Sequence, residues 1–280
     1  MDSAQSYPLE DLYEDIIGKA QRGLGLSDLQ LMERSGLSMF AIQAAKEGEF
    51  HEDSVAPLAE ALGLKPDALG AIGSQQYNPR VSPIEGFLPI NQPATLYPGA
   101  TVNLYLVWDV ETKAAWLFDC GEDATDVVEI VRRHDLKLEA IFLTHGHHDH
   151  IKALPGIREA LGNPPAYAHP QENVAGTEPI HEGEIHTLGR LKLEARSTPG
   201  HSPAGLTYVV SGLERPVAAV GDAIFAGSMG RVEAERFEEA KQAIRDHILS
   251  MGEQTILCPG HGPLTTVALE REHNPFFATE

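Results

Sequence analysis

The pattern of apolar and polar positions divides the chain into a helical first part and a mixed second part. Up to about residue 75, apolar residues recur at the three- and four-residue spacing of short amphipathic helices. Ser27 and Ser38 stand where helix N-caps are expected, and Gly36 and Gly63 stand where helices would end. This pattern predicts a small bundle of four or five short helices.

Beyond about residue 94, short apolar runs bounded by turn residues alternate with amphipathic helical stretches. Strands are predicted at 101–108, 114–118, 140–143, 191–195, 206–210, 217–220 and 255–257. Helices are predicted at 123–134 and near 151–161 and 235–250. Mixed strands and helices of this kind predict a sheet-based α/β sandwich.

A proline-rich segment separates these two parts. Its prolines remove backbone donors and disfavour helix in the residues before them, which predicts an extended connector. We therefore divide the chain into a helical domain at 1–75, a linker at 76–93 and an α/β domain at 94–280.

Composition and charge narrow the classes of partner. The formal net charge is -20, from 41 acidic and 21 basic residues, and such a field repels the phosphates of nucleic acid. The first 14 residues lack the apolar core of a signal peptide, and no apolar run reaches the roughly 20 residues of a membrane span. We expect a cytoplasmic protein that binds neither nucleic acid nor membrane.

Histidine and aspartate cluster at four places that follow predicted strands. Residues 145–150 contain four of the chain's 13 histidines together with one aspartate: His145, His147, His148, Asp149 and His150. His201, Asp222 and His261 each follow a later predicted strand in a glycine-rich turn. Imidazole and carboxylate ligands suit zinc, iron and manganese, so these residues predict a metal site.

In this order, the residues resemble the ligand pattern of the metallo-β-lactamase superfamily: His145, His147, Asp149, His150, His201, Asp222 and His261. Segments 117–121, 221–228 and 259–263, followed by 274–277, are similar to its glyoxalase II-like (hydroxyacylglutathione hydrolase-like) branch. The resemblance covers about residues 93–277. It implies an αββα sandwich for this part of the chain, preceded by the small all-helical domain.

The resemblance also implies roles for these residues. His145, His147 and His201 would bind one divalent ion, Asp149, His150 and His261 a second, and Asp222 would bridge them. Zinc is the expected metal, with iron or manganese as alternatives. A hydroxide bridging the two ions would hydrolyse an acyl thioester such as a hydroxyacylglutathione, with Asp149 as the catalytic residue that orients it and takes its proton. Asp119 is either a partner that holds a ligand histidine or a plain turn residue.

Other functions share parts of this pattern. A persulfide dioxygenase-like enzyme would hold a single iron at His145, His201 and Asp222, and a lactonase would use the same ligands as the thioesterase. A transcriptional regulator with a metal-binding sensor domain is a further alternative. Arg231 and Arg271 are the basic residues we consider for contacts with glutathione or coenzyme A.

Residues 16–69 resemble a Cro/repressor-type helix-turn-helix domain. Residues 1–75 nevertheless carry five basic and thirteen acidic side chains, a net charge of -8, which disfavours DNA binding. The expected recognition helix presents Met39 and Phe40, which favours protein contact. We expect these helices to pack on the hydrolase domain, where they would wall the substrate pocket, or to form a homodimer.

Overall fold

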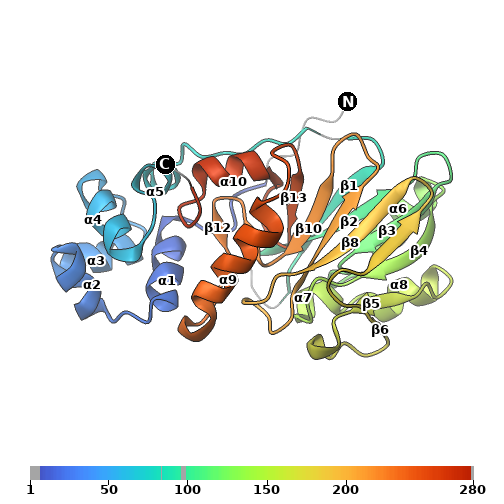
Figure 1. The fold of residues 1–280 in the computed structure, drawn as a ribbon, viewed down its shortest axis with the longest axis horizontal. Helices are drawn as coiled ribbons and strands as arrows, with labels where there is room; N and C mark the ends of the chain where they lie inside the picture. Colours follow the sequence, from blue (N-terminus) through green and yellow to red (C-terminus); the bar gives the residue numbers. More distant parts are fainter. Residues whose placement is uncertain (1–6, 83, 96–98, 279–280) are drawn as a thin grey trace.

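The computed structural model describes residues 7–82, 84–95 and 99–278 (Figure 1). Five helices come first and gather at one end of the molecule: α1 (Tyr13–Gly23), α2 (Asp28–Ser35), α3 (Met39–Lys46), α4 (Glu52–Leu62) and α5 (Pro66–Gly73). The predicted caps are confirmed. The hydroxyls of Ser27 and Ser38 accept backbone hydrogen bonds at the starts of α2 and α3, and Gly36 and Gly63 adopt left-handed conformations after α2 and α4.

The first sheet has six strands in the order β1-β2-β3-β4-β5-β6. Their bounds are β1 (Phe87–Pro93), β2 (Thr101–Trp108), β3 (Ala114–Phe118), β4 (Lys137–Phe142), β5 (Ala166–Ala168) and β6 (Glu178–Pro179). Strands β1 to β3 pair antiparallel, and β3 to β6 pair parallel. The outer face of this sheet is covered by α6 (Thr125–Arg133) and α8 (Leu154–Ala160), whose apolar residues share a core with it.

The second sheet has the order β14-β13-β10-β9-β8-β7. Its strands are β7 (Ile185–Leu188), β8 (Leu191–Ser197), β9 (Leu206–Ser211), β10 (Val217–Gly221), β13 (Ile256–Pro259) and β14 (Thr265–Thr266). A hairpin of β11 (Ile224–Phe225) and β12 (Ser228–Met229) follows β10. The outer helices of this half are η2 (Ala234–Arg236), α9 (Phe237–Ile244), the π-helical turn η3 (Arg245–Leu249) and α10 (Val267–His273).

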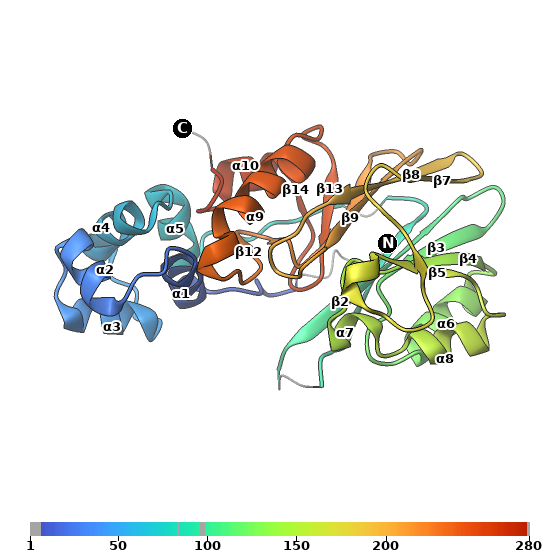
Figure 2. The same ribbon diagram turned by 60° about the horizontal axis from the view of Figure 1, so that its bottom comes forward.

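The two sheets face each other across a buried aromatic layer that includes Phe118, Phe142 and Tyr208. Figure 2 shows α6 and α8 on one side of the paired sheets and α9 and α10 on the other. This helix–sheet–sheet–helix arrangement confirms the predicted αββα sandwich with a helical region before the first strand.

Two local predictions differ from the structure. The proline-rich segment 76–93 is not connector throughout, because its last seven residues form β1 at the edge of the first sheet. An edge strand tolerates Pro89 and Pro93 because only one of its sides takes part in the ladder. The helix predicted near 151–161 divides into α7 (His148–Ile151) and α8, since Pro155 lies in the first turn of α8 and starts a new helix there.

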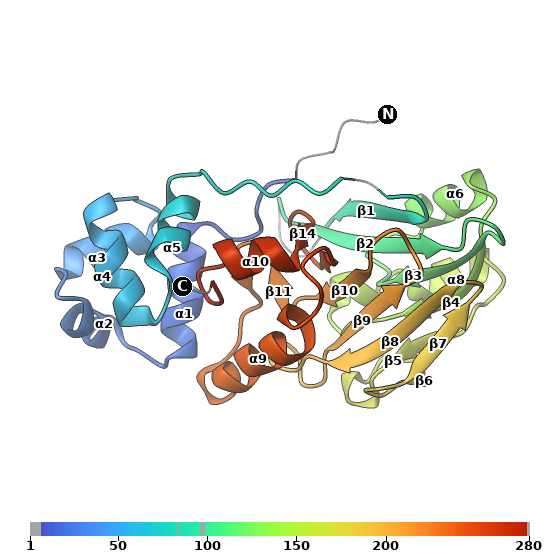
Figure 3. The ribbon, with the colours of Figure 1, turned by 45° about the horizontal axis from the view of Figure 1, so that its top comes forward.

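The N-terminal helices share a hydrophobic core with the outer layer of the second sheet. Ile16 and Leu69 belong to the same buried cluster as Phe237 and Phe276. Figure 3 shows α1 and α5 beside α9 and α10. Of the helices in the described residues, none has the length and apolarity needed to cross a bilayer.

Candidate metal centre

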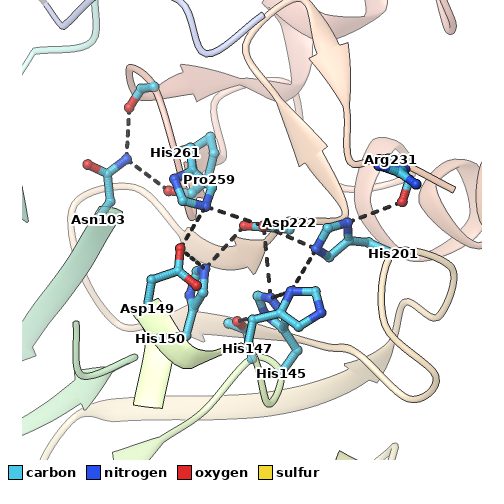
Figure 4. Close-up of polar contacts among 12 residues, drawn as sticks. Asn103, His145, His147, Asp149, His150, His201, Asp222, Arg231, Pro259 and His261 are labelled. Atoms are coloured by element: carbon cyan, nitrogen blue, oxygen red, sulfur yellow. Dashed lines mark hydrogen bonds and ion pairs between the residues drawn. The ribbon is translucent and has the colours of Figure 1, made fainter. Parts of the chain in front are cut away.

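The seven predicted ligand residues follow the ends of four strands, five of them on loops and two, Asp149 and His150, in the short helix α7 (His148–Ile151). His145, His147, Asp149 and His150 follow β4, while His201 follows β8. Asp222 follows β10 directly, and His261 lies two residues beyond β13. Because β10 and β13 are parallel, their carboxyl ends meet at one edge of the second sheet. Figure 4 shows that all seven side chains converge.

Four of these residues form one group. Nδ1 of His147 lies 3.0 Å from Nε2 of His145 and 3.0 Å from Nε2 of His201. Oδ2 of Asp222 lies 3.3 Å from Nε2 of His201 and 3.9 Å from Nε2 of His145. Each residue therefore directs one ligand atom to a common point.

Asp149, His150 and His261 form the second group. Oδ2 of Asp149 lies 3.4 Å from Nε2 of His261 and 3.9 Å from Nε2 of His150. Asp222 faces this group as well, with Oδ1 3.5 Å from Nε2 of His150 and Oδ2 3.4 Å from Nε2 of His261. The carboxylate of Asp222 thus stands between the two groups.

The cluster has unsatisfied buried atoms that a cation would satisfy. Nε2 of His150 and Oδ1 of Asp222 are buried, and within the described part of the chain neither has a hydrogen-bond partner. A Cβ at Gly260 would lie 2.1 Å from Oδ1 of Asp222, so only glycine leaves this space open. Burying such groups without partners is unfavourable. The donor set therefore fits a dinuclear metal site.

Four of the five histidines are held from behind through their outer nitrogen. The partners are Thr144 Oγ1 for His145 (3.0 Å), Asp119 Oδ2 for His150 (2.9 Å), the Arg231 carbonyl for His201 (3.2 Å) and the Thr101 carbonyl for His261 (2.6 Å). Such contacts fix the ring and its tautomer with Nε2 free for a metal.

Asp119 organises two of these contacts. It accepts from His150 directly and from the Thr144 hydroxyl at 2.9 Å, and Thr144 in turn contacts His145. Of the two interpretations that the sequence left open for Asp119, this geometry favours the partner that holds ligand histidines.

Burial and charge act differently on the pKa values of the individual residues in the cluster. Burial lowers the pKa of His145 and of His201. Burial also acts to lower the pKa of His261, but facing Asp222 raises it to about 10. Burial acts to raise the pKa of Asp222, yet His261 and His150 hold it well below its usual value. Protons thus compete with metal ions for part of this site.

A pocket of about 740 Å³ opens onto the cluster, a volume within the range of small-molecule sites. Arg231 lines it, together with Glu10 and Lys19 from the N-terminal region, whereas Arg271 does not. The Lys19 ammonium donates to the Met229 carbonyl at 2.9 Å, pairs with Asp11 and lies 4.8 Å from the centre of the Phe225 ring. Burial raises the pKa of Glu10 to about 7.

Sequence reasoning expected a pocket wall from the helical region but did not single out Glu10 or Lys19. An acidic residue before a helix and a lysine within it are ordinary surface positions in a sequence. Tertiary contacts bring them to the pocket: Lys19 contacts Met229 and Phe225 of the β11–β12 hairpin, and Glu10 lies beside Gly262 in the turn after β13. His148, which lies between ligand residues, is exposed as expected.

Comparison with known proteins decides the family. The model of the metallo-β-lactamase superfamily matches residues 97–261. The chain belongs to this superfamily. Among curated relatives of this metallo-β-lactamase superfamily protein, a "probable metallo-hydrolase" of Streptococcus pyogenes is 30% identical over 200 residues, 62% of this chain and 84% of that protein. Hydroxyacylglutathione hydrolase GloC of Haemophilus influenzae is 30% identical over 197 residues, 62% of this chain and 92% of GloC.

Solved structures of other proteins are also similar to this superfamily member. The BLEG-1 B3 metallo-β-lactamase is 27% identical with a TM-score of 0.57, and the match covers 69% of this chain and 100% of that one. TTHA1623 in a di-iron-bound form is 27% identical with a TM-score of 0.54, covering 68% and 100%. The superfamily model starts at residue 97, so the five N-terminal helices lie outside its match.

Proposed function

We propose that this superfamily member is a dinuclear metal hydrolase that acts on an acyl thioester of the hydroxyacylglutathione type. The observation that carries the proposal is the pair of ligand groups joined by Asp222 at the floor of the pocket. The similarity to GloC of Haemophilus influenzae, whose name states this activity, supports the choice of substrate.

In this proposal His145, His147 and His201 would hold one cation, Asp149, His150 and His261 would hold the other, and Asp222, which faces both groups, would be shared. Two divalent cations, when bound there, would supply a water of lowered pKa and polarise an acyl carbonyl. Asp149 is half-buried at the pocket surface, where its carboxylate can orient the attacking water and accept its proton. The outer contacts of His145, His150, His201 and His261 keep these four rings in place.

Zinc is the proposed metal, since histidine and carboxylate ligands suit it. The same ligands also accept iron and manganese. The di-iron-bound form of TTHA1623 supports iron as the alternative.

The test combines metal content with thioester hydrolysis. We expect elemental analysis to find about two zinc ions per chain. We also expect hydrolysis of S-D-lactoylglutathione, which is measured as the decrease in thioester absorbance. Asp149→Asn should lower kcat by about 10²- to 10⁴-fold, the usual contribution of a positioned acid–base group. The control is His51→Ala, an exposed histidine in the N-terminal region, which should keep the wild-type rate.

Other results of the same measurements would support one of the alternative functions. A protein with two metal ions that hydrolyses lactones but no thioester would be a lactonase. One iron per chain with oxygen consumption on a glutathione persulfide would identify a dioxygenase. A chain that binds no added metal would refute both hydrolase and dioxygenase. The proposed homodimer is tested separately, by measuring the mass of the protein in solution.

A further inference from the structure

His147 differs from the other histidines of the cluster. Its Nδ1 faces His145 and His201, but among the described contacts none involves its Nε2, and the residue is exposed. Within the described part of the chain, its ring is therefore not fixed from behind by a side chain or carbonyl. The position of this ligand depends on the backbone of residues 145–147.

That backbone is held by a carboxylate from another part of the chain. Glu172 ends the short 3-10 turn η1 (Pro170–Glu172), which follows β5. Its Oε2 accepts the backbone N–H of Gly146 at 2.9 Å, between the two ligands His145 and His147. Its Oε1 accepts the backbone N–H of Ala204 at 2.8 Å, three residues after His201.

A second feature shows how closely the turn and this loop meet. A Cβ on Gly146 would lie only 2.6 Å from the backbone carbonyl oxygen of Glu172. Glycine at 146 is thus required by this contact. The loop of His145 and His147 and the loop of His201 are brought to the same carboxylate, whereas the second group has no contact with Glu172 among those described.

We propose that Glu172 is a positioning residue for the metal site formed by His145, His147 and His201. One carboxylate with two backbone donors ties together the two loops that supply these ligands, in place of the missing contact behind His147. Groups that hold metal ligands in place typically change metal affinity by 10- to 100-fold. The inference rests on the metal site of the proposed function and not on its substrate.

The test measures zinc affinity at each site separately, by competition with a chromophoric chelator. His261→Ala leaves the His145 group complete, and His147→Ala leaves the Asp149 group complete. Adding Glu172→Gln to the first variant should weaken zinc binding about tenfold or more. Adding it to the second should leave the affinity unchanged. Glu159→Gln, at an exposed carboxylate on α8, is the matched control.

Unchanged affinity in the His261→Ala background would overturn the inference. Equal losses in both backgrounds would overturn it too, because they would indicate general structural damage. Glu172→Asp keeps the charge and shortens the reach, so if the glutamine variant fails to fold, a loss confined to the same site is expected with aspartate. A wild-type chain that binds none of added zinc, iron and manganese refutes the inference and the proposed function together. If the wild-type chain binds zinc and the Glu172 variants bind it with unchanged affinity, only the inference is refuted.

Discussion

Asp109 is a single buried carboxylate that links turns from both sheets. It follows β2 and accepts backbone N–H groups from Glu111 and Thr112 in its own turn. It also accepts the N–H of Arg190, in the turn between β7 and β8 of the other sheet. The N–H groups of Arg190 and Thr112 lower the pKa of Asp109 from 3.8 to about 2.

The lowered pKa of Asp109 predicts a contribution to acid stability. A carboxylate with a folded pKa below its unfolded pKa stabilises the fold above pH 3.8, and this contribution is lost as the pH falls through about 2. Asp109→Asn should lower the free energy of unfolding at pH 7 by about 1.5–3 kcal/mol, the scale for hydrogen bonds to a charged group. The difference from wild type should shrink between pH 4 and pH 2. Urea unfolding at several pH values measures it, with exposed Asp126→Asn as control.

Some residues of the site could be predicted from the sequence, and others could not. The seven ligand-type residues stand in short histidine- and glycine-rich motifs after strands, so their local pattern predicted them. Glu172 carries no such pattern, because its role comes from a contact with Gly146, which lies 26 positions away in the chain. Asp119 was ambiguous for the same reason, since its contact with His150 spans 31 positions.

Among the elements, α1 carries two glycines in contrasting surroundings. A Cβ on Gly18 would meet no heavy atom within 4 Å. A Cβ on Gly23 would lie 2.4 Å from the ring of Phe237, the buried first residue of α9. Glycine at 23 therefore leaves room for the Phe237 ring against the end of α1, and no such neighbour constrains Gly18.

This contrast predicts opposite effects of one substitution. Gly18→Ala should raise the free energy of unfolding by about 0.5–1 kcal/mol, because alanine favours the helix interior and meets no neighbour. Gly23→Ala should lower it by about 1–3 kcal/mol, because the methyl group overlaps a buried ring. Urea unfolding of the two variants provides the comparison. Equal effects would contradict the docking of α1 on α9.

Most elements were predictable because their signals are local. The caps of α2 and α3 and the limits of β2 and β3 follow from Ser27, Ser38 and two apolar runs. β1 was not predicted, because its prolines argue against a strand and only its place at the sheet edge makes them acceptable. The separation of α7 from α8 was missed although Pro155 was a visible signal.

Across the whole molecule, the N-terminal helices and the second sheet's outer layer form one apolar cluster. The linker adds a polar contact to it, since the Tyr77 hydroxyl donates to buried Glu270 at 2.8 Å. A domain with a separate core could unfold on its own. Helices that share a core with the rest of the chain unfold together with it.

This shared core predicts cooperative unfolding. The two tryptophans, Trp108 and Trp116, lie on β2 and β3 of the first sheet, far in sequence from the N-terminal helices. Urea unfolding followed by tryptophan fluorescence and by helical circular dichroism should give coincident midpoints. A loss of helical signal at lower urea would instead show that the N-terminal helices unfold independently.

The place of Lys19 and Glu10 in the pocket has a consequence for how such a protein can diversify. Both residues belong to a stretch that the superfamily model does not match, whereas the seven histidines and aspartates of the cluster lie within the matched stretch. Substitutions in the stretch from Glu10 to the end of the first helix can therefore change the lining of the pocket while the ligand residues stay unchanged. Descendants of one such enzyme could acquire new selectivity by altering an appendage alone.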